Sequence, residues 1–342
     1  MKKFTKGCLL TALVIFVLGC VVCGVSGLLG GFRQLENISE TTGIPFRYHR
    51  GADGSVEFGF FDPQGNDWTI GTEEVLETIE SGAPDSEKQL ALTADTLRNL
   101  EVDLEGCALA VRESEDEHVW LAVEGSGREV HYAVENGDTL VIDTPDPILN
   151  WPGLRGAVNK TVVYLALPKD AELDAIELEC GAGKIDMSDL KADSIDIELG
   201  AGACSLEALT ARTVVLSVGA GEASVGTLTA KETELEVGAG ELVIEAIRND
   251  GILDLDIGMG NAEINGIITG EMDLDCSMGN VTMKLAGSED DYLYTIDCAM
   301  GNVTVGDHVY ASFVGEKQWG NGENCFDIDC SMGSVTIIFE EP

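Results

Sequence analysis

Apolar and polar residues alternate strictly in eight segments that fill the second half of this chain. Each segment contains a triplet of small residues, and the segments align on the glycine that ends the triplet. These glycines are Gly183, Gly202, Gly221, Gly240, Gly260, Gly279, Gly301 and Gly333. The steps between them are 19, 19, 19, 20, 19, 22 and 32 residues. A nearly constant period in this range indicates a solenoid, in which each repeat stacks on the next.

The unit aligned on Gly202 shows the alternation clearly. Its apolar positions are Ile195, Ile197 and Leu199 before the glycine, and Cys204 and Leu206 after it. A period of two is typical of a β-strand with one buried face. Each unit therefore predicts a strand, a Gly-x-Gly corner, a second strand and a polar return. The expected fold class is all-β, a parallel β-helix or β-solenoid with coils of about 19 residues, preceded by one N-terminal transmembrane helix.

The corners themselves carry two further predictions. Their glycines fit a bend where a Cβ would clash or where φ is positive. The residue at the centre of the corner changes along the chain, in the order Ala182, Ala201, Ala220, Ala239, Met259, Met278, Met300 and Met332. The change from alanine to methionine predicts a core that widens towards the C-terminus, because a longer side chain would fill a larger gap.

Acidic residues fill the positions between the apolar columns. One such column holds the candidate cation ligands Glu179, Glu198, Glu236, Asp256, Asp275, Asp297 and Asp329. Carboxylates stacked about 4.8 Å apart repel each other, and a divalent cation would relieve this repulsion. Calcium-binding solenoids, however, use a Gly-Gly-x-Gly-x-Asp repeat that is missing here. The preferred interpretation is a solvated face that blocks lateral association of sheets, with no metal site assigned; a cation ladder is the alternative.

Asparagines follow the corner in the later units, at Asn261, Asn280 and Asn302. Stacked amides can hydrogen-bond along a solenoid, so a structural ladder is expected. A flat surface that binds glycan hydroxyls is the alternative.

The N-terminus predicts a membrane anchor. Lys2, Lys3 and Lys6 precede an uncharged run over residues 7–32, which is long enough to span a bilayer. The positive residues favour a cytoplasmic N-terminus. The expected location is the cell membrane, single-pass, with the repeats extracytoplasmic. A lipoprotein acylated at Cys20 and a signal peptide cleaved between Gly24 and Gly27 stay open as alternatives, and both also export the repeats.

Ten cysteines in an exported chain would ordinarily suggest disulfides. Cys276, Cys298 and Cys330 share one inward column with Cys180, however. In-register side chains on parallel strands point alongside each other rather than towards each other. Free thiols that act as small core hydrophobes are therefore expected.

Four segments are expected along the chain. Residues 1–32 form the anchor, and residues 33–95 form a juxtamembrane spacer or small subdomain, with a hairpin around residues 50–54 and a short helix over residues 72–80. Residues 96–170 supply capping strands for one end of the solenoid. Residues 171–342 form the Gly-x-Gly repeats, and an insertion at residues 307–324 is expected to cap the far end.

The order of several strand motifs carries a family resemblance. Leu100-Glu-Val-Asp-Leu, Val163-Tyr-Leu-Ala-Leu-Pro168 and Ile176-Glu-Leu with Gly181-Ala-Gly follow one another along the chain. This order resembles the bacterial "putative adhesin" family of β-strand-repeat proteins, over roughly residues 95–342. The resemblance implies an envelope-associated β-solenoid and transfers no catalytic residues.

Charge narrows the classes of function. The chain has 61 acidic and 20 basic side chains, a formal net charge of −41, so nucleic acid is excluded as a partner. Its four histidines do not cluster, which disfavours a histidine-rich metal site. The repeats have few basic residues, which disfavours a carbohydrate-active β-helix enzyme. We expect a non-enzymatic, membrane-anchored, adhesin-like solenoid without a cofactor that binds an unknown protein or glycan at the cell surface. Envelope-stress sensing or scaffolding is the alternative.

Overall fold

The structure is a computed structural model that describes residues 46–50, 56–60, 88–114, 116–124, 129–145, 161–169, 171–311 and 317–340. The chain divides into two compact units. In the first, β1 (Phe46–Arg50) and β2 (Val56–Phe60) form an antiparallel hairpin, as the sequence predicts. The expected transmembrane helix over residues 1–32 and the helix over residues 72–80 lie outside the described residues. Within the described ranges, no helix is long and apolar enough to cross a membrane.

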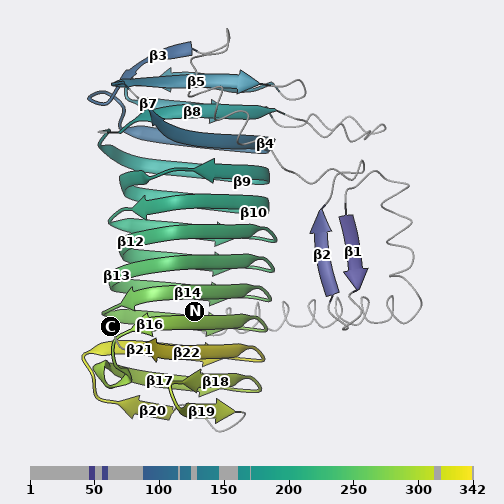
Figure 1. The fold of residues 1–342 in the computed structure, drawn as a ribbon, viewed down its shortest axis with the longest axis vertical. Helices are drawn as coiled ribbons and strands as arrows, with labels where there is room; N and C mark the ends of the chain where they lie inside the picture. Colours follow the sequence, from purple (N-terminus) through teal and green to yellow (C-terminus); the bar gives the residue numbers. More distant parts are fainter. Residues whose placement is uncertain are drawn as a thin grey trace, which may run out of the picture. The chain divides into compact units, whose positions relative to one another are not determined.

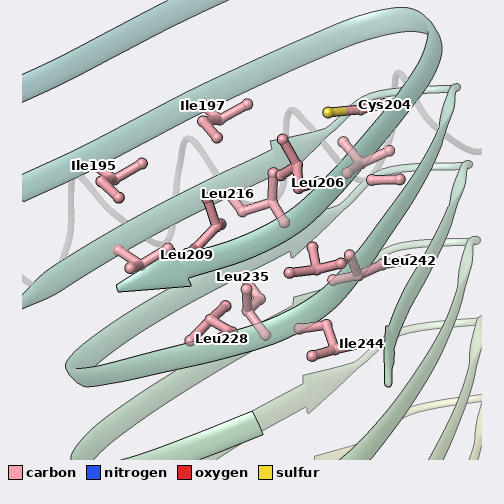
Figure 2. Packing of buried hydrophobic residues seen from close by; sticks show 14 of the residues in the cluster. Ile195, Ile197, Cys204, Leu206, Leu209, Leu216, Leu228, Leu235, Leu242 and Ile244 are labelled. Carbon is pink, nitrogen blue, oxygen red and sulfur yellow. The ribbon is translucent and has the colours of Figure 1, made fainter. Parts of the chain in front are cut away.

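The second unit is the predicted parallel β-solenoid (Figure 1). In its centre, β9 (Leu173–Met187) pairs in parallel with β10 (Leu190–Thr210), so that Ile176 lies beside Ile195 and Ile185 beside Cys204. This register equals one repeat of 19 residues. Figure 2 shows the inward side chains of successive coils, including Ile195, Ile197 and Leu216, packed together in the interior. The apolar columns read from the sequence are therefore the core.

The following coils continue the parallel pairing. Their strands are β11 (Thr213–Val218), β12 (Glu222–Val237), β13 (Glu241–Ile257), β14 (Asn261–Ile268), β15 (Glu271–Cys276) and β16 (Asn280–Ala286). The register shifts by one residue where β13 pairs with β12 and with β14. The sequence suggested a polar return after each second strand, but the return also contains apolar residues. It forms further parallel pairs in which Leu209 lies beside Leu228, and Leu228 beside Ile247. These three side chains are at most 2% exposed, so the return adds a buried column to the core.

The corner glycines are required by contact between coils and not by positive φ. In the corner at Gly221, an added Cβ would lie 2.5 Å from the carbonyl oxygen of Gly202 on the preceding coil. None of the aligned glycines has a positive φ. Of the two explanations that the sequence allowed, the steric one is confirmed.

The methionines at the later corners do not fill the core, so the expectation of a widening core at the corner is wrong. Met259 and Met300 are 60% and 66% exposed. The inward residues on either side of the Met278 corner are Cys276 and Val281, both buried. Because the chain turns between them, the residue at the apex points away from the interior. Larger core side chains do occur at this end, but in the first inward column, where Met272, Phe326 and Tyr294 lie side by side.

The N-terminal end is closed by antiparallel strands. Its elements are β3 (Lys88–Thr93), β4 (Asn99–Ser114), β5 (His118–Glu124), β6 (His131–Glu135), β7 (Thr139–Asp143) and β8 (Val162–Pro168). Strand β4 lies between β9 and a coil made of β7 and β8, parallel to all three. Strands β5 and β6 then pair antiparallel to β8 and β7, and β3 pairs with β5. The turn between β6 and β7 is formed by Asn136 and Gly137, which have φ of 54° and 84°.

The C-terminal end repeats this plan. Its elements are the 3-10 helix η1 (Glu289–Asp291) and strands β17 (Tyr292–Cys298), β18 (Asn302–Val305), β19 (His308–Ala311), β20 (Lys317–Gly320), β21 (Asn324–Cys330) and β22 (Ser334–Glu340). Strands β19 and β20 pair antiparallel to β18 and β17, so the insertion caps this end as predicted.

The last coil of the sequence is not the last coil in space. Strand β21 pairs in parallel with both β15 and β17, and β22 with both β16 and β18. In Figure 1 the yellow β22 accordingly lies between the green β16 and β18. The units were expected to stack in chain order, and this expectation is wrong for the final two. We call the coil of β21 and β22 the intercalated coil.

Aromatic side chains fill the core around the intercalated coil. The rings of Tyr292 and Phe326 have centroids 4.5 Å apart, and Trp319 from the cap stacks on Tyr294 at 4.8 Å. The hydroxyl group of Tyr292 donates to the carbonyl oxygen of Ile268 at 2.9 Å, so this buried polar group is satisfied.

Candidate binding surface

The candidate carboxylates form one continuous row, which we call the acidic ladder. The register of the coils places the candidates next to one another and extends the row by Asp103 and Asp143 at the N-terminal end. In spatial order the positions are Asp143, Asp103, Glu179, Glu198, Ser217, Glu236, Asp256, Asp275, Asp329 and Asp297. Neighbouring positions are about 4.8 Å apart along the solenoid. Only Ser217 interrupts the carboxylates.

Sequence reasoning missed the two N-terminal members because β4 and β7 lie outside the 19-residue repeat. It also placed Asp297 between Asp275 and Asp329, whereas the intercalated coil brings Asp329 between Asp275 and Asp297. Asp103 could have been found from the sequence, because the strand Leu100-Glu-Val-Asp-Leu has the same alternation as the repeats.

Mutual repulsion and partial desolvation shift the titration of the ladder. The pKa of Glu179 is raised mainly by the charge of Asp103, with desolvation next and Glu198 after it. The pKa of Asp275 and that of Asp329 are raised mainly by desolvation; the charge of Asp256 adds to the shift of Asp275, and the charge of Asp275 adds to that of Asp329. Asp256 is shifted upward in pKa for the same reasons. The carboxylates of this face therefore lie close enough together to disfavour one another's ionisation.

A shallow groove runs beside part of the acidic ladder. It has a volume of about 290 Å³ and crosses four successive coils. Its lining combines the ladder residues Glu179, Glu198, Ser217 and Glu236 with the first glycine of each corner and with Cys180, Leu199 and Val218. Its described lining contains no histidine, lysine or arginine. The groove can therefore present carboxylates and peptide groups to a ligand, but it lacks the basic side chains that accompany the acids in polysaccharide-cleaving β-helices.

The ladder is a row and not a cage. Within the residues that the structure describes, no group of three or more acidic, histidine or cysteine side chains is arranged to hold a metal ion. Acids outside the ladder form ion pairs with Arg112, Lys169, Arg212 and Lys284. At the end of the ladder, His131 Nδ1 lies 3.5 Å from Asp143 Oδ1. A ladder bridged by cations thus stays a prediction.

The asparagine ladder is confirmed in one step and broken in the next. The side-chain amide of Asn280 donates to Asn261 Oδ1 at 3.0 Å, along the solenoid axis. Asn302 does not lie next to Asn280, because Ser334 of the intercalated coil stands between them. Asn302 instead donates to Thr304 Oγ1 at 3.3 Å.

The cysteines of the inward column are free thiols, as expected. Cys330 lies between Cys276 and Cys298, and all three are at most 9% exposed. Burial raises the pKa of Cys330 to about 12, so the thiol is protonated at neutral pH. Cys180 belongs to the same column but lies several coils away, beside Leu199.

Fold and surface together define the class of protein: a parallel β-solenoid, closed at both ends by antiparallel strands, with one long acidic face. The chain belongs to the Toastrack family of domains of unknown function, DUF4097, whose family profile matches residues 97–337. That span covers the acidic ladder, strand β4, the intercalated coil and most of the caps. No curated protein matches the chain.

Several solved structures are similar to this chain at low sequence identity. A "putative adhesin" from Bacteroides fragilis is 15% identical with a TM-score of 0.40, covering 74% of this chain and 96% of its own. A "putative cell adhesion protein" from Clostridium sporogenes is 13% identical with a TM-score of 0.22, covering 74% and 99%. A "putative adhesin" from Parabacteroides distasonis is 11% identical with a TM-score of 0.33, covering 74% and 96%. Membership of the family rests on the family profile alone.

Proposed function

We propose that this protein is a non-enzymatic, adhesin-like binding module of the cell envelope. Its N-terminal apolar segment holds it at the membrane as a single-pass anchor, and the solenoid lies outside the cytoplasm. The acidic face binds a macromolecular partner, a protein or a glycan at the cell surface. The positive charges that match the ladder belong to the partner itself or to divalent cations bound between the two.

The observation that carries this proposal is the acidic ladder beside its groove. Rigid parallel coils repeat one carboxylate about every 4.8 Å, so a partner with spaced positive charges meets many of them at once. Such an arrangement speeds encounter and selects partners by charge more than it adds affinity per contact. A groove without basic residues is better suited to binding than to polysaccharide cleavage.

The test is binding of the labelled full-length chain, in detergent, to host-cell or matrix material and to isolated bacterial envelope. Two variants with the same change in charge localise the binding. Glu198→Gln with Glu236→Gln removes two carboxylates that line the groove. Glu222→Gln with Glu241→Gln removes two exposed carboxylates of β12 and β13 that do not line it. We expect the groove variant to bind about tenfold more weakly and the second variant to stay within about twofold of the native chain.

Saturable binding to host or matrix material supports adhesion, and its loss in chelator supports bridging by divalent cations. Binding only to the bacterium's own envelope, or no binding at all, would overturn the adhesin proposal. Envelope sensing or scaffolding would then be the better assignment. Equal effects of the two variants would show that net charge, and not the groove, drives binding.

A further inference from the structure

Four exposed methionines lie in a line along the corners of the C-terminal coils. In spatial order they are Met259, Met278, Met332 and Met300, with 60%, 37%, 50% and 66% of their surface exposed. We call them the methionine ridge. The equivalent corners of the earlier coils carry alanine instead. A row of large apolar side chains in water opposes the hydrophobic effect, so the ridge calls for an explanation other than packing.

Backbone hydrogen bonds fix the spacing of the ridge. The amide group of Met278 donates to the carbonyl oxygen of Gly258 at 2.8 Å, on the coil that carries Met259. Met332 donates to Ser277 at 2.7 Å, and Met300 to Ser331 at 2.7 Å. The parallel pairing thus continues through the corners, and neighbouring methionines start from backbone positions about 4.8 Å apart. The ridge is continuous only because the intercalated coil inserts Met332 between Met278 and Met300.

This spacing suits a metal ion held by sulfur. The thioether of methionine is a soft, neutral ligand that suits copper(I), whereas zinc and iron–sulfur clusters, which sulfur also binds, are held by charged thiolates. Bonds of about 2.3 Å, the length of a zinc–sulfur bond in proteins, would place two sulfurs on opposite sides of an ion about 4.6 Å apart. That separation agrees with the distance between neighbouring coils, so flexible methionine side chains can approach an ion from adjacent corners without rearrangement of the backbone.

Negative charge and further sulfur surround the ridge. Each methionine follows a member of the acidic ladder by three residues, namely Asp256, Asp275, Asp329 and Asp297. These carboxylates attract a cation to the surface. Three of the methionines also follow a buried cysteine by two residues, at Cys276, Cys330 and Cys298.

The buried thiols lie directly beneath the corners that carry the ridge. The Sγ atom of Cys276 occupies the space where a Cβ on Gly333 would be, and the Sγ atom of Cys330 does the same at Gly301. Gly333 and Gly301 immediately follow Met332 and Met300. Thioethers at the surface therefore overlie a column of thiols, a concentration of sulfur that the alanine corners do not have.

We propose that the methionine ridge binds a soft monovalent metal ion of the copper(I) class through thioether sulfurs from neighbouring coils. The buried thiols form a second layer of sulfur beneath the ions. This binding is separate from the function proposed for the acidic groove, which lies over the coils with alanine corners.

Titration with silver(I) nitrate, a redox-inert probe of the same class, tests the proposal. The full-length chain is used in chloride-free buffer with detergent, after N-ethylmaleimide has blocked accessible thiols. Met278→Leu with Met332→Leu removes two thioethers from the ridge and keeps its apolar character. Met272→Leu with Met283→Leu removes two fully buried thioethers and is the matched control. We expect the ridge variant to bind silver about tenfold or more weakly, and the control to stay within about twofold of the native chain.

A third variant separates thioethers from thiols. Cys276→Ala with Cys330→Ala is expected to retain silver binding at the ridge. Loss of binding in this variant, with full binding in the ridge variant, would overturn the proposal because the thiols would then be the ligands. Absence of binding in the native chain, or equal loss in the ridge variant and the control, would overturn it as well. Circular dichroism of each variant shows whether the solenoid has folded.

Discussion

The corner positions require glycine because the neighbouring coil leaves no room for a Cβ there. Each corner passes so close to the preceding one that a carbonyl oxygen occupies the place of the missing Cβ, as at Gly221 above Gly202. The residue at the apex has open space instead, and Ala220 beside Gly221 is exposed. Within one corner, adjacent positions therefore tolerate substitution very differently.

Gly221→Ala should destabilise the protein by about 1–3 kcal/mol, the usual cost of overpacking, because the new methyl group meets backbone atoms that cannot turn aside. Urea unfolding of the full-length chain measures the change. Ala220→Ser is the control, with an expected effect of at most about 0.5 kcal/mol at an exposed position. Equal stability of the two variants would contradict the steric account of the corner.

The acidic ladder should make the solenoid more stable at mildly acidic pH. The pKa of Glu179, Asp256, Asp275 and Asp329 is raised in the folded protein. Folding then takes up protons, and the free energy of unfolding rises as the pH falls through the raised pKa. For the aspartates this gain is complete below their ordinary pKa of 3.8. Above the raised pKa the full repulsion is present, so the ladder is least favourable at neutral pH and higher.

Urea unfolding between neutral and mildly acidic pH measures this gain. Asp275→Asn with Asp329→Asn should be more stable than the native chain at neutral pH and should gain less on acidification. Asp116→Asn is the control, because a hydrogen bond from the backbone amide group of His118 lowers the pKa of Asp116. Loss of that carboxyl should leave the acid gain intact or increase it. A native chain that loses stability over the same range would refute the prediction.

At the scale of the elements, the two ends of the solenoid follow one plan. In each, an outer coil is covered by two antiparallel strands, and a coil distant in sequence lies inside it. At the N-terminus the inner coil is β4, and at the C-terminus it is the intercalated coil. Antiparallel caps cover the open edge of the parallel sheets, which would otherwise offer unpaired backbone groups to other chains.

Phe326→Ala should weaken the C-terminal end by about 3–5 kcal/mol, the cost of deleting a buried aromatic ring. Phe326 is 1% exposed and packs against Tyr292 and Tyr294, so its loss opens a cavity between the intercalated coil and β17. Phe339→Ala, at a half-buried position of β22, should cost clearly less. Urea unfolding reports the loss of stability, and limited proteolysis shows whether the C-terminal coils open first. Equal effects of the two substitutions would argue against tight packing around Phe326.

The stacking order was beyond sequence reasoning because every coil presents nearly the same pattern. A strand with inward residues Phe326, Ile328 and Cys330 fits against β15 as well as against β17, since both offer alternating apolar side chains. The long final step of the repeat, 32 residues, indicated an insertion and its capping role. It did not reveal that the chain crosses the cap and returns to the inner side.

At the scale of the whole molecule, charge opposes the compact fold. A net charge of −41 and an acidic ladder interrupted only at Ser217 create repulsion that extends over many coils. Salt screens such repulsion, because the Debye length falls from about 30 Å at 0.01 M to about 10 Å at 0.1 M. Stability should therefore depend on ionic strength far more than in a protein with balanced charges.

Sodium chloride should raise the thermal midpoint between about 0.01 M and 0.5 M, with most of the gain at the low end, where screening changes fastest. Differential scanning calorimetry of the full-length chain follows the midpoint. Glu198→Gln with Glu236→Gln, which relieves part of the ladder, should show a smaller rise from a higher starting value. A midpoint that is flat or falls with salt would show that the acidic face is already neutralised by bound cations.

The sequence by itself determined the strands, the corners, the inward columns and the acidic face. These follow from a two-residue alternation inside a 19-residue period, and such a pattern can bury its apolar side only by stacking. Tertiary structure decided which coils are neighbours, and with them the order Met278, Met332 and Met300 along the ridge. It also decided that the methionines face solvent. The order of the coils depends on long-range pairing, and the exposure of the methionines depends on the direction of the chain at a bend. The local pattern of residues encodes neither.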